Sequence, residues 1–195
     1  MEEAIINRYE VLMIGGSAGS LEVLLQVLPQ LKEDLSLAVI IILHRKNAES
    51  QLAELLGDIS PWCVKEAEEK EKILPGTVYI APADYHLLIE KDKTFSLDYS
   101  EKINYSRPSI DASFETAAEA YGKAVIAILL SGANADGSAG LEKIKQAGGV
   151  TIAQNPEEAS VSYMPQQAID NLAVDYIAGT QQMIEIIHQF SAGKS

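Results

Sequence analysis

The chain has 195 residues, of which 47% are apolar and 22% are charged, and its formal net charge at pH 7 is −13. This length suits one domain with a substantial core, so we expect residues 1–195 to form a single domain. The acidic balance argues against a nucleic-acid partner, because phosphate binding needs clustered Lys and Arg. No segment is long and apolar enough to span a bilayer, and the acidic start lacks a signal-peptide pattern, so a cytoplasmic protein without membrane insertion is expected.

The first half of the chain alternates strand and helix patterns. In chain order, these predict a strand over 9–15, a helix over 21–31, a strand over 37–43 and a helix over 50–59 that ends near Gly57. The second strand, "LAVIIIL", is apolar throughout, which is typical of burial on both faces of a parallel sheet. Ser20 is the candidate N-cap of the first helix. The charged segment 65–72 is expected to be a solvated loop or helix face, and Cys63 a packed or half-exposed thiol.

The second half adds a hairpin and then returns to alternating strands and helices. After a strand over 77–83, apolar and polar residues alternate around Lys91-Asp92-Lys93, which predicts an antiparallel hairpin. The later patterns predict a helix over 109–121 capped by Ser109 or Asp111, a strand over 124–132, a helix over 140–149, a strand over 150–154, and helices over 166–173 and 181–190. The alternation indicates right-handed βαβ units. The predicted fold class is therefore α/β: a doubly wound, mostly parallel sheet with helices on both faces and an antiparallel β-hairpin insertion.

Polar residues follow the predicted strands at their carboxyl ends, where open parallel sheets bind ligands. Ser17 follows the first strand, His44 the second, and Asp136 lies in the loop after "AVIAILLSG". These three side chains are expected at one rim of the sheet, the edge formed by the carboxyl ends of its strands. A hydroxyl, an imidazole and a carboxylate are the parts of a nucleophilic serine site, in which the carboxylate holds the imidazole in the correct tautomer. Asp136 could equally cap the helix that follows it. Asp84 and His86 reach the same rim, and we expect His86 to be structural.

The loop after the first strand fits an esterase pattern better than a phosphate-binding one. It lacks the lysine of a P-loop, and neither Gly15 nor Gly16 starts a G-x-G-x-x-G fingerprint. The pattern G-x-S-x-G does fit from Gly15 onward, between a strand and a helix. The chain order Ser17, His44, Asp136 nevertheless differs from that of the usual α/β hydrolase, in which the acid precedes the histidine. On these residues alone, phosphate binding and a plain turn stay open for Ser17.

Six motifs, in chain order, resemble those of a known family. They are "IGGSAGS", "LHRK", "LPGTVYIAPADYHL", "SRPSID", "LLSGANADGSAGL" and "AQNPEEASVSYMPQQAI". Over about residues 9–179 the chain resembles the catalytic domain of the chemotaxis protein-glutamate methylesterase family, CheB. The resemblance implies a doubly wound parallel sheet and hydrolysis of glutamate γ-methyl esters on the cytoplasmic helices of chemoreceptors, with release of methanol. It also implies, in many members, deamidation of certain receptor glutamines; no cofactor or metal is expected.

The resemblance also implies roles for individual residues. The family's nucleophile matches Ser17, its base His44, and its aspartate Asp136. Backbone N–H groups near Ala18 and Ala133 are expected to stabilise the oxyanion. Apart from the resemblance, Arg107, in the loop before Pro108, is a candidate contact to the substrate or to a carboxylate.

The chain departs from the family around these residues. Ala18 stands where the family commonly has threonine, Leu43 where it has glutamine, and Ala133 where it often has methionine. Arg45 and Lys46 stand where the family often has apolar and proline-containing residues. The changed residues around His44 motivate a second hypothesis, an esterase of the same fold that acts on a substrate other than chemoreceptors. A third hypothesis is a non-catalytic or nucleotide-binding signalling module, against which the intact serine, histidine and aspartate weigh.

The best-known members of the family carry an N-terminal receiver domain. Here the first strand is predicted to begin near residue 9, which leaves no room for one. We therefore expect a stand-alone methylesterase-like catalytic domain, regulated by a separate protein or through its expression.

Overall fold

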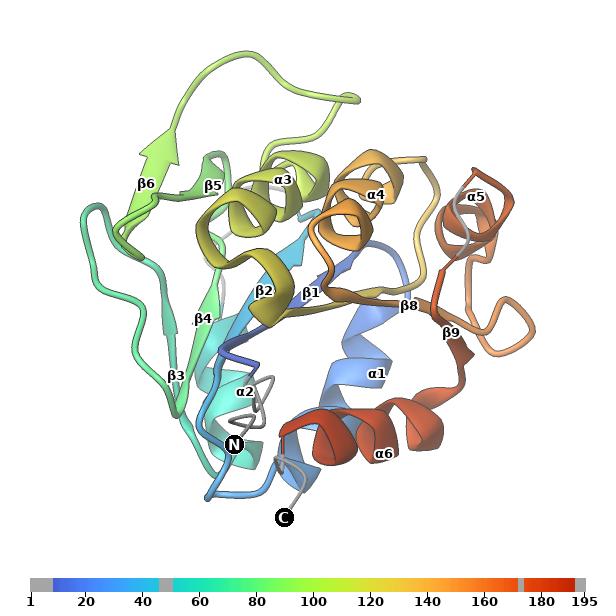
Figure 1. Ribbon diagram of the computed structural model, residues 1–195, viewed down its shortest axis with the longest axis horizontal. Helices are drawn as coiled ribbons and strands as arrows, with labels where there is room; N and C mark the ends of the chain where they lie inside the picture. Colours follow the sequence, from blue (N-terminus) through green and yellow to red (C-terminus); the bar gives the residue numbers. More distant parts are fainter. Residues whose placement is uncertain (1–8, 46–50, 172–173, 192–195) are drawn as a thin grey trace, which may run out of the picture.

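The computed structural model describes residues 9–45, 51–171 and 174–191 (Figure 1). Within these ranges, seven strands form one sheet in the order β3-β4-β2-β1-β7-β8-β9, and every neighbouring pair is parallel. The strands are β1 (Val11–Gly16), β2 (Ala38–Leu43), β3 (Cys63–Glu66), β4 (Thr77–Ile80), β7 (Val125–Leu129), β8 (Val150–Gln154) and β9 (Tyr176–Ala178). The predicted hairpin is confirmed as a separate antiparallel pair, β5 (His86–Ile89) and β6 (Phe95–Asp98).

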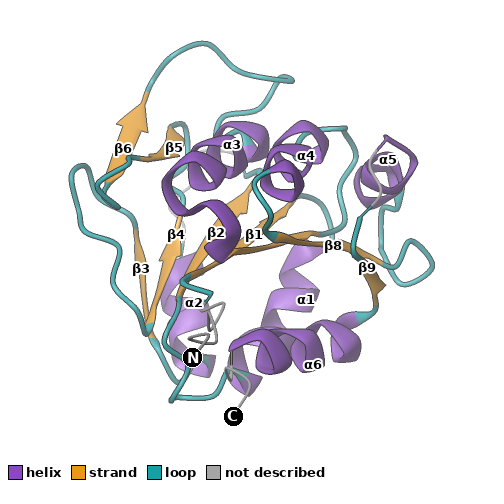
Figure 2. Cartoon of the chain, viewed as in Figure 1, coloured by secondary structure: helices purple, strands orange, loops and turns teal. Residues whose placement is uncertain are grey.

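Helices cover both faces of the sheet (Figure 2). They are α1 (Ser20–Val27), α2 (Leu52–Ile59), α3 (Ile110–Tyr121), α4 (Ser138–Gln146), α5 (Tyr163–Asn171) and α6 (Thr180–Ser191), with short 3-10 turns η1 (Leu28–Gln30) and η2 (Gly122–Ala124). Successive strand residues point to opposite faces, so Leu12 packs with α1 and α6 while Met13 packs with α3 and α4. The doubly wound α/β fold is therefore confirmed. None of the described helices is long and apolar enough to cross a membrane.

The two short strands at the sheet edges are absent from the sequence prediction. Residues 63–66 form β3 beside β4, so the predicted loop or helix face over 65–72 is wrong at its start. Charged side chains are tolerated there because an edge strand is open to solvent. Cys63 is exposed, so the expected packed or half-exposed thiol is also wrong. At the other edge, β9 has only three residues, too few to show a strand period.

Helix ends agree with the sequence where a side chain makes the cap. Ser109 is confirmed as the N-cap of α3, since its hydroxyl accepts a hydrogen bond from the Ala112 N–H at 3.2 Å. Helix α2 continues past Gly57 to Ile59. Residue 50 at the start of that predicted helix lies outside the described residues, as do 172–173 at the end of the predicted helix 166–173.

The chain changes direction across the sheet between β1 and β7. Strands β2, β4 and β3 lie on one side of β1, whereas β7, β8 and β9 lie on the other. In open parallel sheets such a switch point opens a crevice at the carboxyl ends of the two strands, and ligands bind there. Ser17 follows β1 and Asp136 lies in the loop that follows β7, so the topology brings two of the predicted catalytic residues to the switch point.

Candidate active site

The loop after β1 is tied to the loop after β7 by short polar contacts. Gly19 has a φ of 83° and is the residue that caps α1, so the prediction of Ser20 as N-cap is wrong. A left-handed backbone favours glycine, which explains its place in the turn. The Ser20 hydroxyl instead accepts a hydrogen bond from the Ser17 N–H at 3.0 Å and donates to the Ser131 carbonyl at 2.9 Å. The Ser17 N–H lies 2.8 Å from the same carbonyl, so the backbone of Ser17 is held from two sides.

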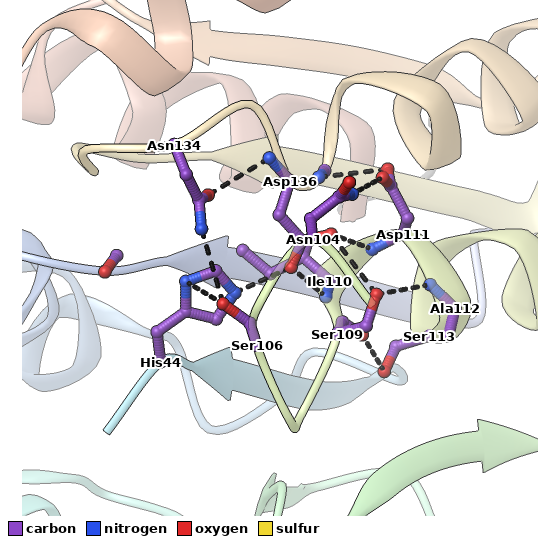
Figure 3. Close-up of polar contacts among 12 residues, drawn as sticks. His44, Asn104, Ser106, Ser109, Ile110, Asp111, Ala112, Ser113, Asn134 and Asp136 are labelled. Atoms are coloured by element: carbon purple, nitrogen blue, oxygen red, sulfur yellow. Dashed lines mark hydrogen bonds and ion pairs between the residues drawn. The ribbon is translucent and has the colours of Figure 1, made fainter. Parts of the chain in front are cut away.

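His44 and Asp136 are in direct contact although 92 positions separate them. His44 follows β2 at once, and its Nε2 lies 2.6 Å from Asp136 Oδ2 (Figure 3). The Asp136 side chain is fully buried and that of His44 is 11% exposed. Because an ionised carboxylate only accepts, this short bond holds the imidazole with its proton on Nε2. The other ring nitrogen, Nδ1, is then the acceptor that a general base requires.

The Asp136 carboxylate lies on the N-terminus of α3. Its Oδ2 accepts a hydrogen bond from the Ile110 N–H at 2.7 Å, and its Oδ1 accepts from the Asp111 N–H at 3.0 Å and the Ser109 hydroxyl at 3.2 Å. Burial alone would raise its pKa, but the bonds from His44 and from the Asp111 and Ile110 backbones outweigh burial and lower the pKa of Asp136. Asp136 thus caps α3, and not α4, the helix that follows it.

Asp111 makes the reciprocal contact, from α3 to the N-terminus of α4. Its Oδ1 accepts hydrogen bonds from the Gly137 N–H at 2.9 Å and the Gly140 N–H at 2.7 Å, and its Oδ2 accepts from Asn104 Nδ2 at 3.2 Å. Burial, reinforced by the neighbouring Asp136 carboxylate, raises the pKa of Asp111 to about 6 against the effect of these bonds. The N-terminus of α3 is therefore bonded by Asp136 from the loop before α4, and the N-terminus of α4 by Asp111 from α3, and these two sets of bonds hold the loop that carries Asp136.

Two polar side chains that the sequence analysis did not assign to the site complete the surroundings of His44. Ser106 Oγ lies 3.4 Å from His44 Nδ1, and Asn134 Nδ2 lies 3.3 Å from Ser106 Oγ (Figure 3). Asn134 Oδ1 accepts the backbone N–H of Asp136 at 3.1 Å. The sequence signal for Asn134 is its spacing of two residues before Asp136, which is typical of an Asx turn. Nothing local marks Ser106, because its partner is distant in the chain.

Ser17 and His44 follow the neighbouring strands β1 and β2. In the β1–β2 ladder, Gly16 is paired with Leu43, and the His44 N–H donates to the Gly16 carbonyl at 3.0 Å. Ser17 and His44 are the next residues of two strands that run about 4.8 Å apart. Among the described residues, none forms a hydrogen bond with Ser17 Oγ. Contacts to a nucleophile are often loose before substrate binds, and Ser17 stays the predicted nucleophile.

Two backbone N–H groups near Ser17 have no acceptor among the described residues. They belong to Ala18 and Ala133, the residues predicted to stabilise the oxyanion. Ala133 follows Gly132, and a Cβ atom built on Gly132 would come within 3.0 Å of Ser17 Cβ. The loop after β7 therefore approaches Ser17 more closely than a side chain at position 132 would readily allow. Both N–H groups are available to a ligand oxygen, and the oxyanion role stays a prediction.

Arg107 contacts two residues of its own loop and, outside that loop, the carboxylate of Asp84. Its guanidinium donates to the Ser100 carbonyl at 2.8 Å and to Asp84 Oδ1 at 3.2 Å, and it stacks 3.9 Å from the ring centroid of Tyr99. These contacts fasten the loop over 99–107. The predicted contact between Arg107 and the substrate stays a prediction.

Two other rim residues have structural partners. Both ring nitrogens of the buried His86 bond to backbone groups, Nε2 to the Glu101 carbonyl at 2.8 Å and Nδ1 to the Ser109 N–H at 3.1 Å. Arg45 pairs with Glu66 at the end of β3 and donates to the Ala81 carbonyl at 3.2 Å. The departure at Lys46 lies outside the described residues.

Comparisons with known proteins identify a family and a fold that this chain shares. The sequence model of the CheB methylesterase family matches residues 12–187. A putative protein-glutamate methylesterase/protein-glutamine glutaminase of Leptospira interrogans is 43% identical over 179 residues, which cover 91% of this chain and 93% of that protein. The protein-glutamate methylesterase/protein-glutamine glutaminase of Thermotoga maritima is 34% identical, and the match covers 91% of this chain but 54% of that protein. The crystal structure of the Thermotoga maritima CheB methylesterase catalytic domain matches with a TM-score of 0.88 at 34% identity, over 93% of this chain and 98% of that one.

Proposed function

The chain belongs to the CheB methylesterase family, and from this premise we propose that it hydrolyses glutamate γ-methyl esters on the cytoplasmic helices of chemoreceptors, releasing methanol. One observation carries the proposal in this chain: the 2.6 Å contact of His44 with the buried Asp136, which leaves the other ring nitrogen free to act as a base at the edge of the sheet where Ser17 follows β1. The names of the relatives support the substrate class. The proposal places the enzyme in the cytoplasm and invokes no cofactor, nucleic acid or membrane insertion.

Acylation follows from the roles of the three side chains. Ser17 Oγ attacks the ester carbonyl carbon while His44 Nδ1 accepts the hydroxyl proton. Asp136 keeps the imidazole in the required tautomer and stabilises the imidazolium that forms. The N–H groups of Ala18 and Ala133 donate to the oxyanion of the tetrahedral intermediate. His44 then gives its proton to the departing methoxide, which leaves as methanol.

Deacylation reverses these roles with water as the nucleophile. His44 takes a proton from water as the water oxygen attacks the Ser17 ester, and then returns that proton to Ser17 Oγ. The products are a glutamate carboxylate and free enzyme. A glutamine side chain can follow the same course, with ammonia as the leaving group, and the names of the relatives include this activity.

The test is methanol release from methylated receptor membranes by Ser17→Ala. Loss of a nucleophilic serine costs a triad hydrolase about 10⁶-fold in kcat, so we expect no detectable release. Ser100→Ala is the matched control, because Ser100 lies in an exposed loop and, among the described residues, its hydroxyl bonds only to Asp98. Mass spectrometry after fluorophosphonate treatment should place the label on Ser17. A wild-type rate in Ser17→Ala, or a label on another serine, would refute the nucleophile.

The same assay separates the esterase hypotheses. If the wild-type enzyme hydrolyses simple methyl esters through Ser17 but leaves receptor membranes methylated, the substrate is something other than a chemoreceptor. If it hydrolyses no ester and takes no label, the non-catalytic hypothesis prevails.

A further inference from the structure

A second hydroxyl, that of Ser106, faces the basic nitrogen of His44. We propose that Ser106, held by Asn134, is a positioning residue that occupies His44 Nδ1 in the resting site, so that Ser17 must displace it before attack. The contact itself stands on the geometry around His44. Its effect on catalysis rests on the proposed function.

The hydrogen bonds around His44 form a closed ring in which every donor has one acceptor. His44 Nε2–H donates to Asp136 Oδ2, and the Asp136 N–H donates to Asn134 Oδ1. Asn134 Nδ2 in turn donates to Ser106 Oγ. With Nε2 committed to the carboxylate, His44 Nδ1 can only accept, so the Ser106 hydroxyl donates to it. The ring therefore specifies the direction of all four hydrogen bonds.

The backbone holds Ser106 in place. Ser106 and Ile103 exchange two backbone hydrogen bonds, at 2.9 and 3.1 Å, across a tight turn. The two central residues of the turn, Asn104 and Tyr105, have φ values of 50° and 62°, as the tight two-residue turns of hairpins require. The Asn104 side chain ties the turn to Asp111 in α3. Ser106 thus reaches His44 from an anchored turn, although the loop is long.

Competition follows from the single lone pair of a neutral imidazole nitrogen. Ser17 and Ser106 cannot both donate in line to Nδ1, and among the described residues only Ser106 does so. The 3.4 Å contact is at the long end for a hydrogen bond, so the competitor is a weak one. Its removal should raise the rate of attack by Ser17 by only about 2- to 10-fold, the effect of one modest hydrogen bond.

Nitrogen-15 NMR of the histidine rings tests the contact without any substrate. The chain has three histidines, and His86 Nδ1, which accepts the Ser109 N–H, is an internal reference for a bonded ring nitrogen. We expect Ser106→Ala to move the His44 Nδ1 resonance toward the value of an unbonded imine nitrogen. Ser106→Thr, which keeps the hydroxyl, and Ser17→Ala should leave it in place. A resonance that moves in Ser17→Ala and stays in Ser106→Ala would overturn the proposal.

Methanol release then tests the catalytic consequence. We expect kcat to rise by about 2- to 10-fold in Ser106→Ala, to stay near wild type in Ser106→Thr, and to be unchanged in the loop control Ser100→Ala. A fall in kcat for Ser106→Ala would refute the competition. If the wild-type enzyme releases no methanol, the proposed function fails, and the NMR shifts still decide whether Ser106 holds His44.

Discussion

Asp136→Asn tests whether the charge of this buried carboxylate orients His44. The carboxylate accepts four hydrogen bonds, two on each oxygen. An amide of the same shape replaces one oxygen by an NH₂ group. At the Oδ2 position this group would face His44 Nε2–H and the Ile110 N–H; at the Oδ1 position it would face the Asp111 N–H and the Ser109 hydroxyl. Either orientation sets donors against donors.

The structure sets the size of the effect. A buried backbone N–H left without an acceptor costs about 1–3 kcal/mol, and the lost charge weakens the remaining bonds. We therefore expect the free energy of unfolding to fall by about 2–4 kcal/mol and Tm to fall by roughly 5–15 °C. His44 can accept from the new amide only if its proton moves to Nδ1, and that tautomer cannot take the Ser17 proton. A wrong tautomer of this kind costs a serine protease triad about 10⁴-fold in kcat.

Two measurements check the expectation: kcat from methanol release, and Tm from thermal unfolding followed by circular dichroism. Asp170→Asn is the matched control, because Asp170 is an exposed carboxylate on α5 that accepts one hydrogen bond, from Gln166. The control should keep the wild-type kcat and Tm. An Asp136→Asn enzyme with kcat within about tenfold of wild type would refute the reasoning, because the predicted loss is about 10⁴-fold.

Two further predictions concern the residues that support the site. Burial raises the pKa of Asp111 to about 6, so the folded protein holds this proton more tightly than the unfolded chain. The protonated Asp111 side chain therefore favours the folded state at low pH, and this contribution is lost as pH rises through about 6. In urea unfolding, the free energy of unfolding of Asp111→Asn minus that of wild type should therefore rise by about 1–2 kcal/mol between about pH 4.5 and about pH 7.5. The whole pKa difference between the folded and unfolded states would correspond to about 3 kcal/mol, and the expected change is smaller because solvent screens a partly exposed group. An equal difference at both pH values would contradict this. Arg107→Gln should lower Tm by a few degrees, since its ion pair and ring stacking are lost, and should leave KM unchanged; a KM that rises about tenfold would instead support a direct contact with the substrate.

Long apolar runs made much of the fold predictable. The strand over 37–43 and the strand over 124–132 are apolar at every position that the sheet buries, so their pattern identifies β2 and β7 without reference to the rest of the chain. The short strands β3 and β9 lie at the edges, where burial does not impose a pattern, and the sequence analysis does not predict them. The cap of α1 was mispredicted for a related reason: Ser20 has the chemistry of a cap, but a distant carbonyl on Ser131 takes its hydroxyl.

By itself, the sequence determined which side chains follow the buried strands, because hydrophobic periodicity and turn chemistry are local properties. It therefore placed Ser17, His44 and Asp136 on one rim. Only the tertiary structure decided which of them touch and which atoms meet. The contact between His44 and Asp136 joins residues 92 positions apart, and the contact that brings Ser106 to His44 spans 62. Such partners depend on the strand order and on how the loops close over the rim, and no local pattern encodes either.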